Sequence, residues 1–307
     1  MMEFSTPRRI LNLYKNGFMG SVCDPDDVAK LMGELPMPVF GAAAHHLHGD
    51  GEGEISLPFK SLIKFVPGFG PTEKQTTGDC VSHSTRNAVD ITRAVEIDIK
   101  GEREEFVARG ATEAIYQSRD HKGQGMSCSV AARYVHQKGG ILLRKDYGRI
   151  DLSKYDSDIG ADHDVPDSIY YDEAQKHQVK TISSIRTVEE ARDALANGYA
   201  LSVCSGYGFS SRRDKDGIAK QSGSWSHAMT WIAADDTRTR HNETLFLIAN
   251  SWGLWNSGPK VHDQPDGSFW VREKDARGML SDGGAWVFSD VDGFPARKID
   301  WTIDEVF

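Results

Sequence analysis

The chain has 307 residues, 39% of them hydrophobic, and is long enough to bury the cores of two domains of ordinary size. Its formal net charge is −9, with 36 basic and 45 acidic residues, so it lacks the basic surface that general nucleic-acid binding requires. The N-terminus carries no apolar run long enough for a signal peptide or a membrane span, so no membrane partner is expected.

Residues 1–54 are predicted to form an N-terminal arm. Short helices are expected over Pro7–Leu13 and Pro25–Leu35, and the prolines that follow end the second. We interpret the arm as a docking segment that packs on the body of the protein, or alternatively as a regulatory pro-segment. The histidines of Ala44–Asp50 are of the type that binds transition metals, but the Gly- and Glu-rich residues after them favour an exposed linker. No metal and no other cofactor is expected.

Residues 55–160 are predicted to form a mainly helical domain around a helix that begins at Cys80. Apolar residues recur at helical spacing from Val81 to Val95. A Cys in the first turn of a helix lies at the positive end of the helix dipole, which lowers its pKa and favours the thiolate. Cys80 is therefore a candidate nucleophile that needs a base. His83 lies one turn into the same helix, is poorly aimed at Cys80 and is interpreted as a packing or surface residue.

Residues 161–307 are predicted to form a β-rich domain. The polar stretch 151–170 is interpreted as the crossing between the two domains. A helix is expected over Thr187–Leu195, with Thr187 as its cap and Glu190 completing a capping box. Further short helices and strands are expected over Ala111–Tyr116, Ser129–His136, Ala200–Cys204, Ser268–Arg272 and Trp286–Ser289.

Two predicted strands carry candidate partners for Cys80. Trp225–Ala233 and Thr244–Asn250 read as an antiparallel pair, and the charged, Gly/Ser-rich Phe209–Ser224 before them reads as a surface loop. His227 is expected near the start of the first strand and Asn250 at the end of the second, so the two would be neighbours across the ladder. The Asn carbonyl can then hold one ring nitrogen of the His and leave the other to face Cys80.

These segments, taken in chain order, resemble the papain-like cysteine peptidase family. The resemblance rests on a Gln before Cys80, on His227 followed by Ala, and on the Asn-Ser-Trp-Gly run from Asn250; that run is its specific part. It covers roughly residues 55–300. It implies an α+β fold of two domains, one helical and one β-barrel-like, with the active-site cleft between them.

The resemblance also implies a role for each residue. Cys80 would attack a peptide carbonyl, His227 would act as base and acid, and Asn250 would orient the imidazole. The Gln75 amide and the Cys80 backbone N–H would form the oxyanion hole. The partner would be a peptide or protein substrate, and the reaction needs no cofactor.

The chain departs from the family's pattern beside the nucleophile. Gln75 stands one residue closer to Cys80 than is usual, and Val81 replaces the usual aromatic residue. One alternative is therefore a weakly active or inactive papain-like module that serves as a binding or assembly component through its N-terminal arm, for example in a virus particle. A second alternative is acyl transfer by the same Cys–His pair, which the Asn-Ser-Trp-Gly run disfavours.

The four cysteines are Cys23, Cys80, Cys128 and Cys204. If Cys80 is a nucleophile, an odd number remains, so a fully paired framework is excluded. We expect four free thiols, with Cys204 buried in the core, and a reducing cytoplasmic or other intracellular setting, or alternatively a virion.

Overall fold

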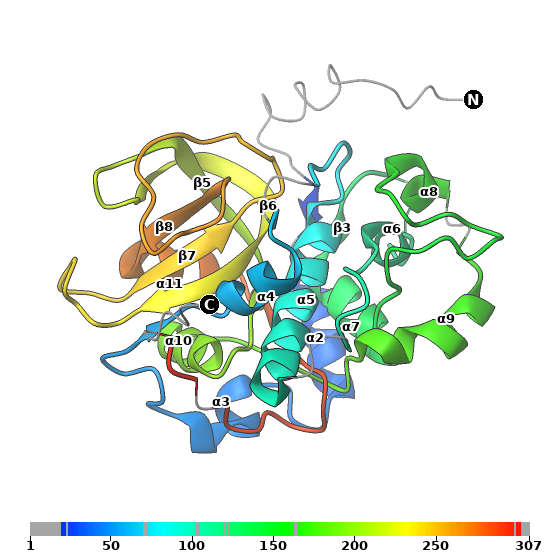
Figure 1. Cartoon of the computed structure of the whole chain (residues 1–307), viewed down its shortest axis with the longest axis horizontal. Helices are drawn as coiled ribbons and strands as arrows, with labels where there is room; N and C mark the ends of the chain where they lie inside the picture. Colours follow the sequence, from blue (N-terminus) through cyan, green and yellow to red (C-terminus); the bar gives the residue numbers. More distant parts are fainter. Residues whose placement is uncertain are drawn as a thin grey trace.

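The structure, a computed structural model, describes residues 20–22, 24–69, 73–101, 105–119, 121, 123–162, 165–297 and 299–301. The helix predicted over Pro7–Leu13 and the predicted free thiol of Cys23 lie outside these residues. The described chain has an α+β fold, in which most helices gather on one side and a twisted sheet lies on the other (Figure 1).

The helices largely follow the amphipathic runs of the sequence. Thr187 caps its helix as predicted, because its side chain accepts the Glu190 N–H at 3.1 Å. The Glu190 carboxylate instead accepts the N–H groups of Gly41 and Arg186. The helices are α2 (Pro25–Glu34), α3 (Phe40–Ala43), α4 (Phe59–Phe65), α5 (Cys80–Lys100), α6 (Thr112–Tyr116), α7 (Cys128–Gln137), α8 (Ser157–Asp162), α9 (Asp167–Glu173), α10 (Val188–Ala196) and α11 (Glu273–Leu280), with 3-10 turns η1 (His45–Leu47) and η3 (Ala174–His177).

The strands of the described residues form one large antiparallel sheet and one short parallel pair. The large sheet has the order β4-β9-β5-β6-β7-β8, and β2 also pairs with β6. An isolated bridge between Ile218 and Trp270 brings the start of β6 to β8, so this sheet curls back on itself. The strands are β1 (Ser21–Val22), β2 (Ile55–Ser56), β3 (Met126–Ser127), β4 (Thr181–Ser184), β5 (Leu201–Arg213), β6 (Ala219–Asp235), β7 (Leu245–Ala249), β8 (Ser268–Arg272) and β9 (Gly284–Ser289).

Helix α5 joins the two sides of the molecule. Nearly every residue from Cys80 to Ile97 is buried, and the helix packs on β5 and β6 as well as on α4, α6 and α7. One apolar cluster runs through α5 into the sheet and contains Cys80, Ile91, Ile232 and Leu247. The start of α5 is therefore held against β6, which is what places Cys80 beside the sheet.

The loop predicted over Phe209–Ser224 is instead mainly a long, irregular hairpin. β5 and β6 pair as far as Arg213 and Ala219, with shifts of register between Ser205 and Arg213. Phe209 is buried and its ring centroid lies 5.1 Å from that of Phe269. The Gly and Ser residues that favoured a loop are accommodated by the irregular ladder.

Two other polar stretches are ordered elements rather than linkers. The predicted crossing 151–170 contains α8 and most of α9, and α8 packs on α6. The His-rich stretch forms η1, where Leu47 is buried and the His46 ring lies 3.0 Å from the Phe294 carbonyl oxygen. Both stretches are ordered by packing on residues distant in the chain. Their own composition does not reveal such contacts.

The prediction of four free thiols is wrong. Cys128 and Cys204 form a disulfide, with Cα atoms 6.0 Å apart, and Cys80 is a buried free thiol. The bond links the first residue of α7 to β5, so it joins the helical side to the sheet. The inference of a reducing compartment therefore loses its basis.

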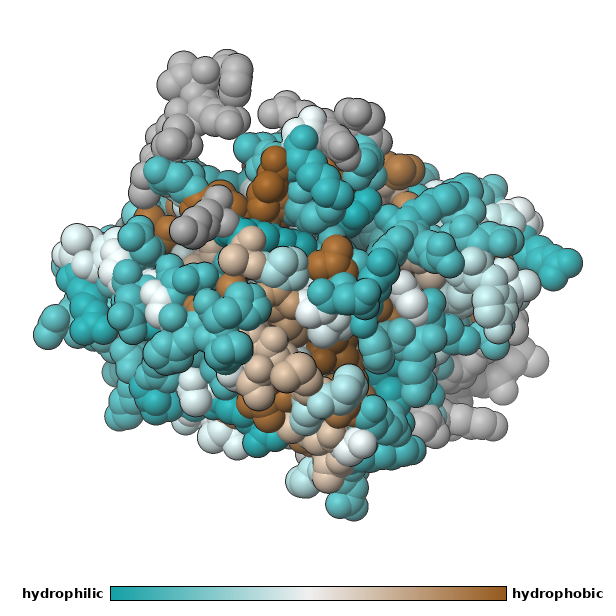
Figure 2. Space-filling model, turned by 90° about the horizontal axis from the view of Figure 1, so that it is seen from below, coloured by the Kyte–Doolittle hydropathy of each residue, from teal (hydrophilic) through white to brown (hydrophobic). Residues whose placement is uncertain are grey.

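The molecular surface is largely hydrophilic on the face shown in Figure 2, where a narrower band of apolar residues runs down the middle. Large exposed apolar side chains are scattered over the described residues: Val22, Met37, Ile99, Val107, Tyr171 and Leu254. Within the part of the chain that the structure describes, no helix is both long enough and apolar enough to cross a membrane.

Candidate active site

Cys80 is the first residue of α5, as the sequence predicts. Its sulfur accepts a hydrogen bond from the Ala228 backbone N–H at 3.4 Å. Ala228 lies on β6 and immediately follows His227, so this contact brings the nucleophile candidate next to the base candidate. The N–H groups of a helix's first turn have no partner within the helix, so the Cys80 N–H is suited to bind an oxyanion.

His227 lies within β6 and is held by Asn250, which directly follows β7. The His227 Nε2 atom lies 2.8 Å from the Asn250 Oδ1 atom. This contact requires Nε2 to carry the proton, which leaves the lone pair on Nδ1. No described residue forms a hydrogen bond with Nδ1. The Trp252 ring stacks on the imidazole with centroids 4.5 Å apart and screens one of its faces.

Gln75 is tied to the residues that follow Asn250. Its backbone N–H donates to the Ser251 carbonyl at 2.9 Å. Its side-chain Oε1 accepts from Ser251 Oγ at 2.5 Å and from Trp252 Nε1 at 3.1 Å, while Nε2 donates to the Thr77 carbonyl at 2.8 Å. Two donors on one atom fix the orientation of the amide. The structure thus brings the two predicted segments, Gln75 and Asn250–Trp252, into direct contact.

Burial reverses the predicted acidity of Cys80. Burial raises the pKa of the thiol above its ordinary range, outweighing the Ala228 hydrogen bond, and the Asp79 carboxylate acts in the same direction as burial. Burial also lowers the pKa of His227 to about 4, although its bond to Asn250 opposes this. A helix terminus contributes about 0.3–1 kcal/mol, whereas full burial shifts a pKa by up to about 3–5 units. At neutral pH the pair is therefore a neutral thiol and a neutral imidazole.

A short strand of the N-terminal arm lies against the site. β1 pairs in parallel with β3 and packs on β5 and β6; Figure 1 shows it at the junction of the helices and the sheet. The Gly20 carbonyl accepts the Met126 N–H at 2.9 Å. Gly20 also packs on Gly78, so closely that a Cβ there would lie 2.2 Å from the Gly78 oxygen. Consistent with such a cover, both Cys80 and His227 are 0% exposed.

Two sets of contacts made by the loop before Cys80 have no signal in the sequence. Tyr155 donates its hydroxyl to Asp79 at 2.7 Å, and Glu73 forms ion pairs with Arg86 and Arg144. Tyr155 lies in the polar stretch that was predicted to cross between domains, and nothing in its spacing ties it to Cys80. His83 is buried, as packing implies, with its ring 5.1 Å from that of Tyr155.

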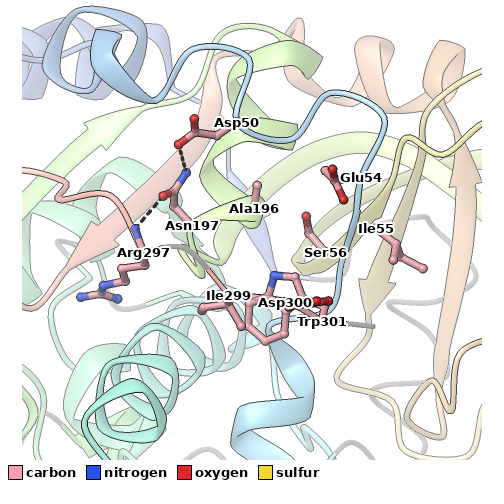
Figure 3. A pocket seen from close by; sticks show the side chains of 10 residues that line it. All are labelled: Asp50, Glu54, Ile55, Ser56, Ala196, Asn197, Arg297, Ile299, Asp300 and Trp301. Carbon is pink, nitrogen blue, oxygen red and sulfur yellow. Dashed lines mark hydrogen bonds between the residues drawn. The ribbon is translucent and has the colours of Figure 1, made fainter. Parts of the chain in front are cut away.

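A pocket of about 520 Å³ lies away from these residues (Figure 3). It opens between the loop before β2, the end of α10 and the residues before Trp301. At one side of the pocket, the Asn197 side-chain amide donates a hydrogen bond to the Asp50 carboxylate. It contains none of Gln75, Cys80, His227 or Asn250. No group of three or more His, Cys, Asp or Glu side chains suited to a metal ion occurs among the described residues.

Comparison with known proteins gives likenesses among solved structures only. No family model and no curated protein matches the chain. It is similar to xylellain, a cysteine protease from Xylella fastidiosa, with 18% identity over 76% of this chain and 89% of that one and a TM-score of 0.48. It is similar to digestive procathepsin L 3 of the Tenebrio molitor larval midgut, with 15% identity over 94% of each chain and a TM-score of 0.46. It is also similar to procathepsin L2 of the same tissue, with 15% identity over 71% and 64% and a TM-score of 0.40.

Proposed function

We propose that the chain is a papain-like cysteine peptidase that hydrolyses peptide bonds of peptide or protein substrates. One observation carries the proposal: His227 binds Asn250 through Nε2, its Nδ1 has no hydrogen-bond partner among the described residues, and the next residue, Ala228, contacts the Cys80 sulfur. A nucleophile beside a base that a third group orients is the arrangement that acyl transfer needs.

The proposed reaction has two stages and needs no cofactor. Cys80 gives its proton to His227 Nδ1 as its sulfur attacks the substrate carbonyl carbon. The C–N bond then breaks as His227 protonates the leaving amine, and a thioester forms. Water, deprotonated by His227, attacks the thioester and releases the acid and the thiol. Gln75 Nε2 and the Cys80 backbone N–H stabilise the oxyanion in both stages.

In this proposal, the N-terminal arm keeps the enzyme latent. Parallel pairing of β1 with β3 and the close contact of Gly20 with Gly78 support a cover over the site. The cover explains why the thiol and imidazole are both neutral, because the two groups are desolvated. Displacing β1 would rehydrate them and allow proton transfer from Cys80 to His227.

The test combines turnover with labelling of Cys80. We expect cleavage of members of a broad peptide library and covalent labelling by a peptide epoxide or vinyl sulfone, both abolished by Cys80→Ala. Thermal unfolding of the variant would show that it still folds. Absence of turnover and labelling, even after β1 is displaced, would contradict the proposal.

The alternative is an inactive papain-like module that serves in an assembly, for example in a virion. The observation that favours it is the complete burial of Cys80 and His227. In that case the N-terminal arm would be a permanent docking segment, and displacing β1 would expose a thiol no more reactive than an ordinary one. The labelling experiment therefore separates the two functions.

A further inference from the structure

The loop Glu73–Asp79 sets the geometry of the proposed oxyanion hole, because it carries Gln75 and leads directly into Cys80. It is one residue shorter, between Gln and Cys, than the pattern that the sequence resembles. The Gln75 amide donates to Thr77 of this same loop. Ser251 and Trp252 hold the other end of the amide through Oε1, so the position of Nε2 depends both on these contacts and on how the loop itself is held.

Partly buried ion pairs anchor the start of this loop. The Glu73 carboxylate lies 2.6 Å from an Arg86 nitrogen of α5 and 2.9 Å from an Arg144 nitrogen. Burial alone would raise the pKa of Glu73, but the two guanidinium groups outweigh it and hold that pKa well below the ordinary range. Glu73 is therefore ionised at neutral pH, and the start of the loop is fixed to the helix that Cys80 begins.

A single hydroxyl connects the middle of the loop to its end. Tyr155 OH accepts the Thr76 backbone N–H at 3.0 Å and donates to Asp79 Oδ2 at 2.7 Å. Thr76 adjoins Gln75, and Asp79 adjoins Cys80. Burial and the Asp79 charge raise the pKa of Tyr155 well above its ordinary value, so the hydroxyl keeps its proton and stays a donor at neutral pH.

We propose that Tyr155 is a positioning residue for the oxyanion hole: its hydroxyl bridges Thr76 and Asp79 and thereby holds the Gln75 amide and the Cys80 N–H at the spacing that one oxyanion requires. This role rests on the proposed peptidase function. Among the described contacts, Tyr155 makes none with the Cys80 sulfur or the His227 imidazole, so it acts through the loop. A donor displaced by even about 1 Å loses much of its effect in such a site.

The test is Tyr155→Phe, which removes the hydroxyl and keeps the ring. Three quantities are compared with wild type: turnover of a peptide substrate, affinity for a peptide aldehyde, and alkylation of Cys80 by iodoacetamide. The aldehyde forms a tetrahedral adduct whose oxygen occupies the oxyanion hole, whereas alkylation forms no oxyanion. We expect kcat and aldehyde affinity to fall roughly 10-fold or more, with KM and the alkylation rate changed less than about 2-fold.

The matched control is Tyr147→Phe, which removes a hydroxyl that donates to the Leu143 carbonyl at 3.0 Å on the same side of the molecule. It should leave all three quantities unchanged. Gln75→Ala completes a double-mutant cycle. If Tyr155 acts through Gln75, the Tyr155→Phe change should lower kcat much less in the Gln75→Ala variant than in wild type.

The outcomes separate this role from the proposed function. If wild type turns over and Tyr155→Phe matches it in kcat and aldehyde affinity, the positioning role is wrong and the peptidase stands. If Tyr155→Phe slows alkylation as much as it weakens the aldehyde, its effect is general damage to the nucleophile, and the role is again wrong. Absence of turnover and of aldehyde binding in the protein with Tyr155 intact, even after β1 is displaced, contradicts both.

Discussion

His227 makes the stability of the protein depend on pH. Its pKa is lowered from 6.5 to about 4 by burial. The unfolded chain therefore binds this proton at a higher pH than the folded chain, so the stabilisation is complete above pH 6.5 and is lost as pH falls towards 4. At pH 4 the loss from this residue is about 3 kcal/mol.

The matching experiment is urea unfolding of wild type and His227→Gln at pH 7 and at pH 4. Gln keeps a polar group near Asn250 but does not titrate in this range. We expect the variant to lose about 3 kcal/mol less than wild type between the two pH values. Equal losses in the two proteins would show that His227 is solvated, and would remove the argument for a covered site.

Asn250 should affect catalysis by orienting His227 rather than by reacting. Asn250→Ala removes the bond to Nε2, so the imidazole can rotate and take up either tautomer. We expect kcat to fall, but less than in His227→Ala, which we expect to abolish turnover. Steady-state kinetics on one peptide substrate measure both. An Asn250→Ala variant as inactive as His227→Ala would imply a direct chemical role for Asn250.

The sequence singles out Cys80, His227 and Asn250 as candidates, because their order and neighbouring residues form a recognisable pattern, and the structure brings their segments into contact. It could not supply the protonation state of Cys80, since that depends on desolvation by segments far away in the chain. Tyr155 was missed for the same reason. The Tyr155 hydroxyl is linked to the loop by hydrogen bonds with Thr76 and Asp79 across the fold, and such contacts leave no periodicity in the sequence.

At the scale of elements, β1 can be tested as a cover by a single added methyl group. Gly20 has φ +109°, and a Cβ there would lie 2.2 Å from the backbone oxygen of Gly78. Gly20→Ala should therefore displace β1 and speed labelling of Cys80 by roughly 10-fold or more, because full burial can suppress the thiolate by several pKa units. The rate of epoxide labelling followed by mass spectrometry measures this.

Gly33→Ala is the control for that experiment. Gly33 lies in α2, also in the N-terminal arm, but a Cβ there meets nothing within 4 Å. It should leave the labelling rate unchanged. If Gly20→Ala also leaves it unchanged while thermal unfolding shows an intact fold, β1 is not what limits access to Cys80.

Sequence reasoning predicted elements well where local signals were strong, as at the start of α5 and at the Thr187 cap. It failed for the β5–β6 hairpin. The Gly, Ser and charged residues of Phe209–Ser224 have a low strand propensity, and the pairing is decided by tertiary contacts such as Phe209 on Phe269. Similarly, Ser157–Asp162 is too short to signal a helix without its packing on α6.

For the whole molecule, the Cys128–Cys204 disulfide is a covalent cross-link between the helical side and the sheet. The cysteine count led to the expectation of free thiols. The count could not reveal this bond, because proximity in the fold decides which cysteines pair. Cys128 begins α7 and Cys204 lies on β5, and both belong to the apolar cluster that contains Cys80. The two sides that form the candidate site are thus held together at their shared core.

Loss of this disulfide should lower the stability of the fold. The disulfide closes a loop with a sequence separation of 76 residues, so the chain-entropy model predicts that its loss lowers the free energy of unfolding by about 4 kcal/mol. The double variant Cys128→Ala/Cys204→Ala should show this decrease in urea unfolding and should still fold, because α5 packs on the sheet through its own apolar residues. Wild type treated with reductant should behave like the variant. If capping of the unreduced, denatured protein modifies Cys128 and Cys204, the bond is absent in solution, and reductant should then leave the unfolding curve unchanged.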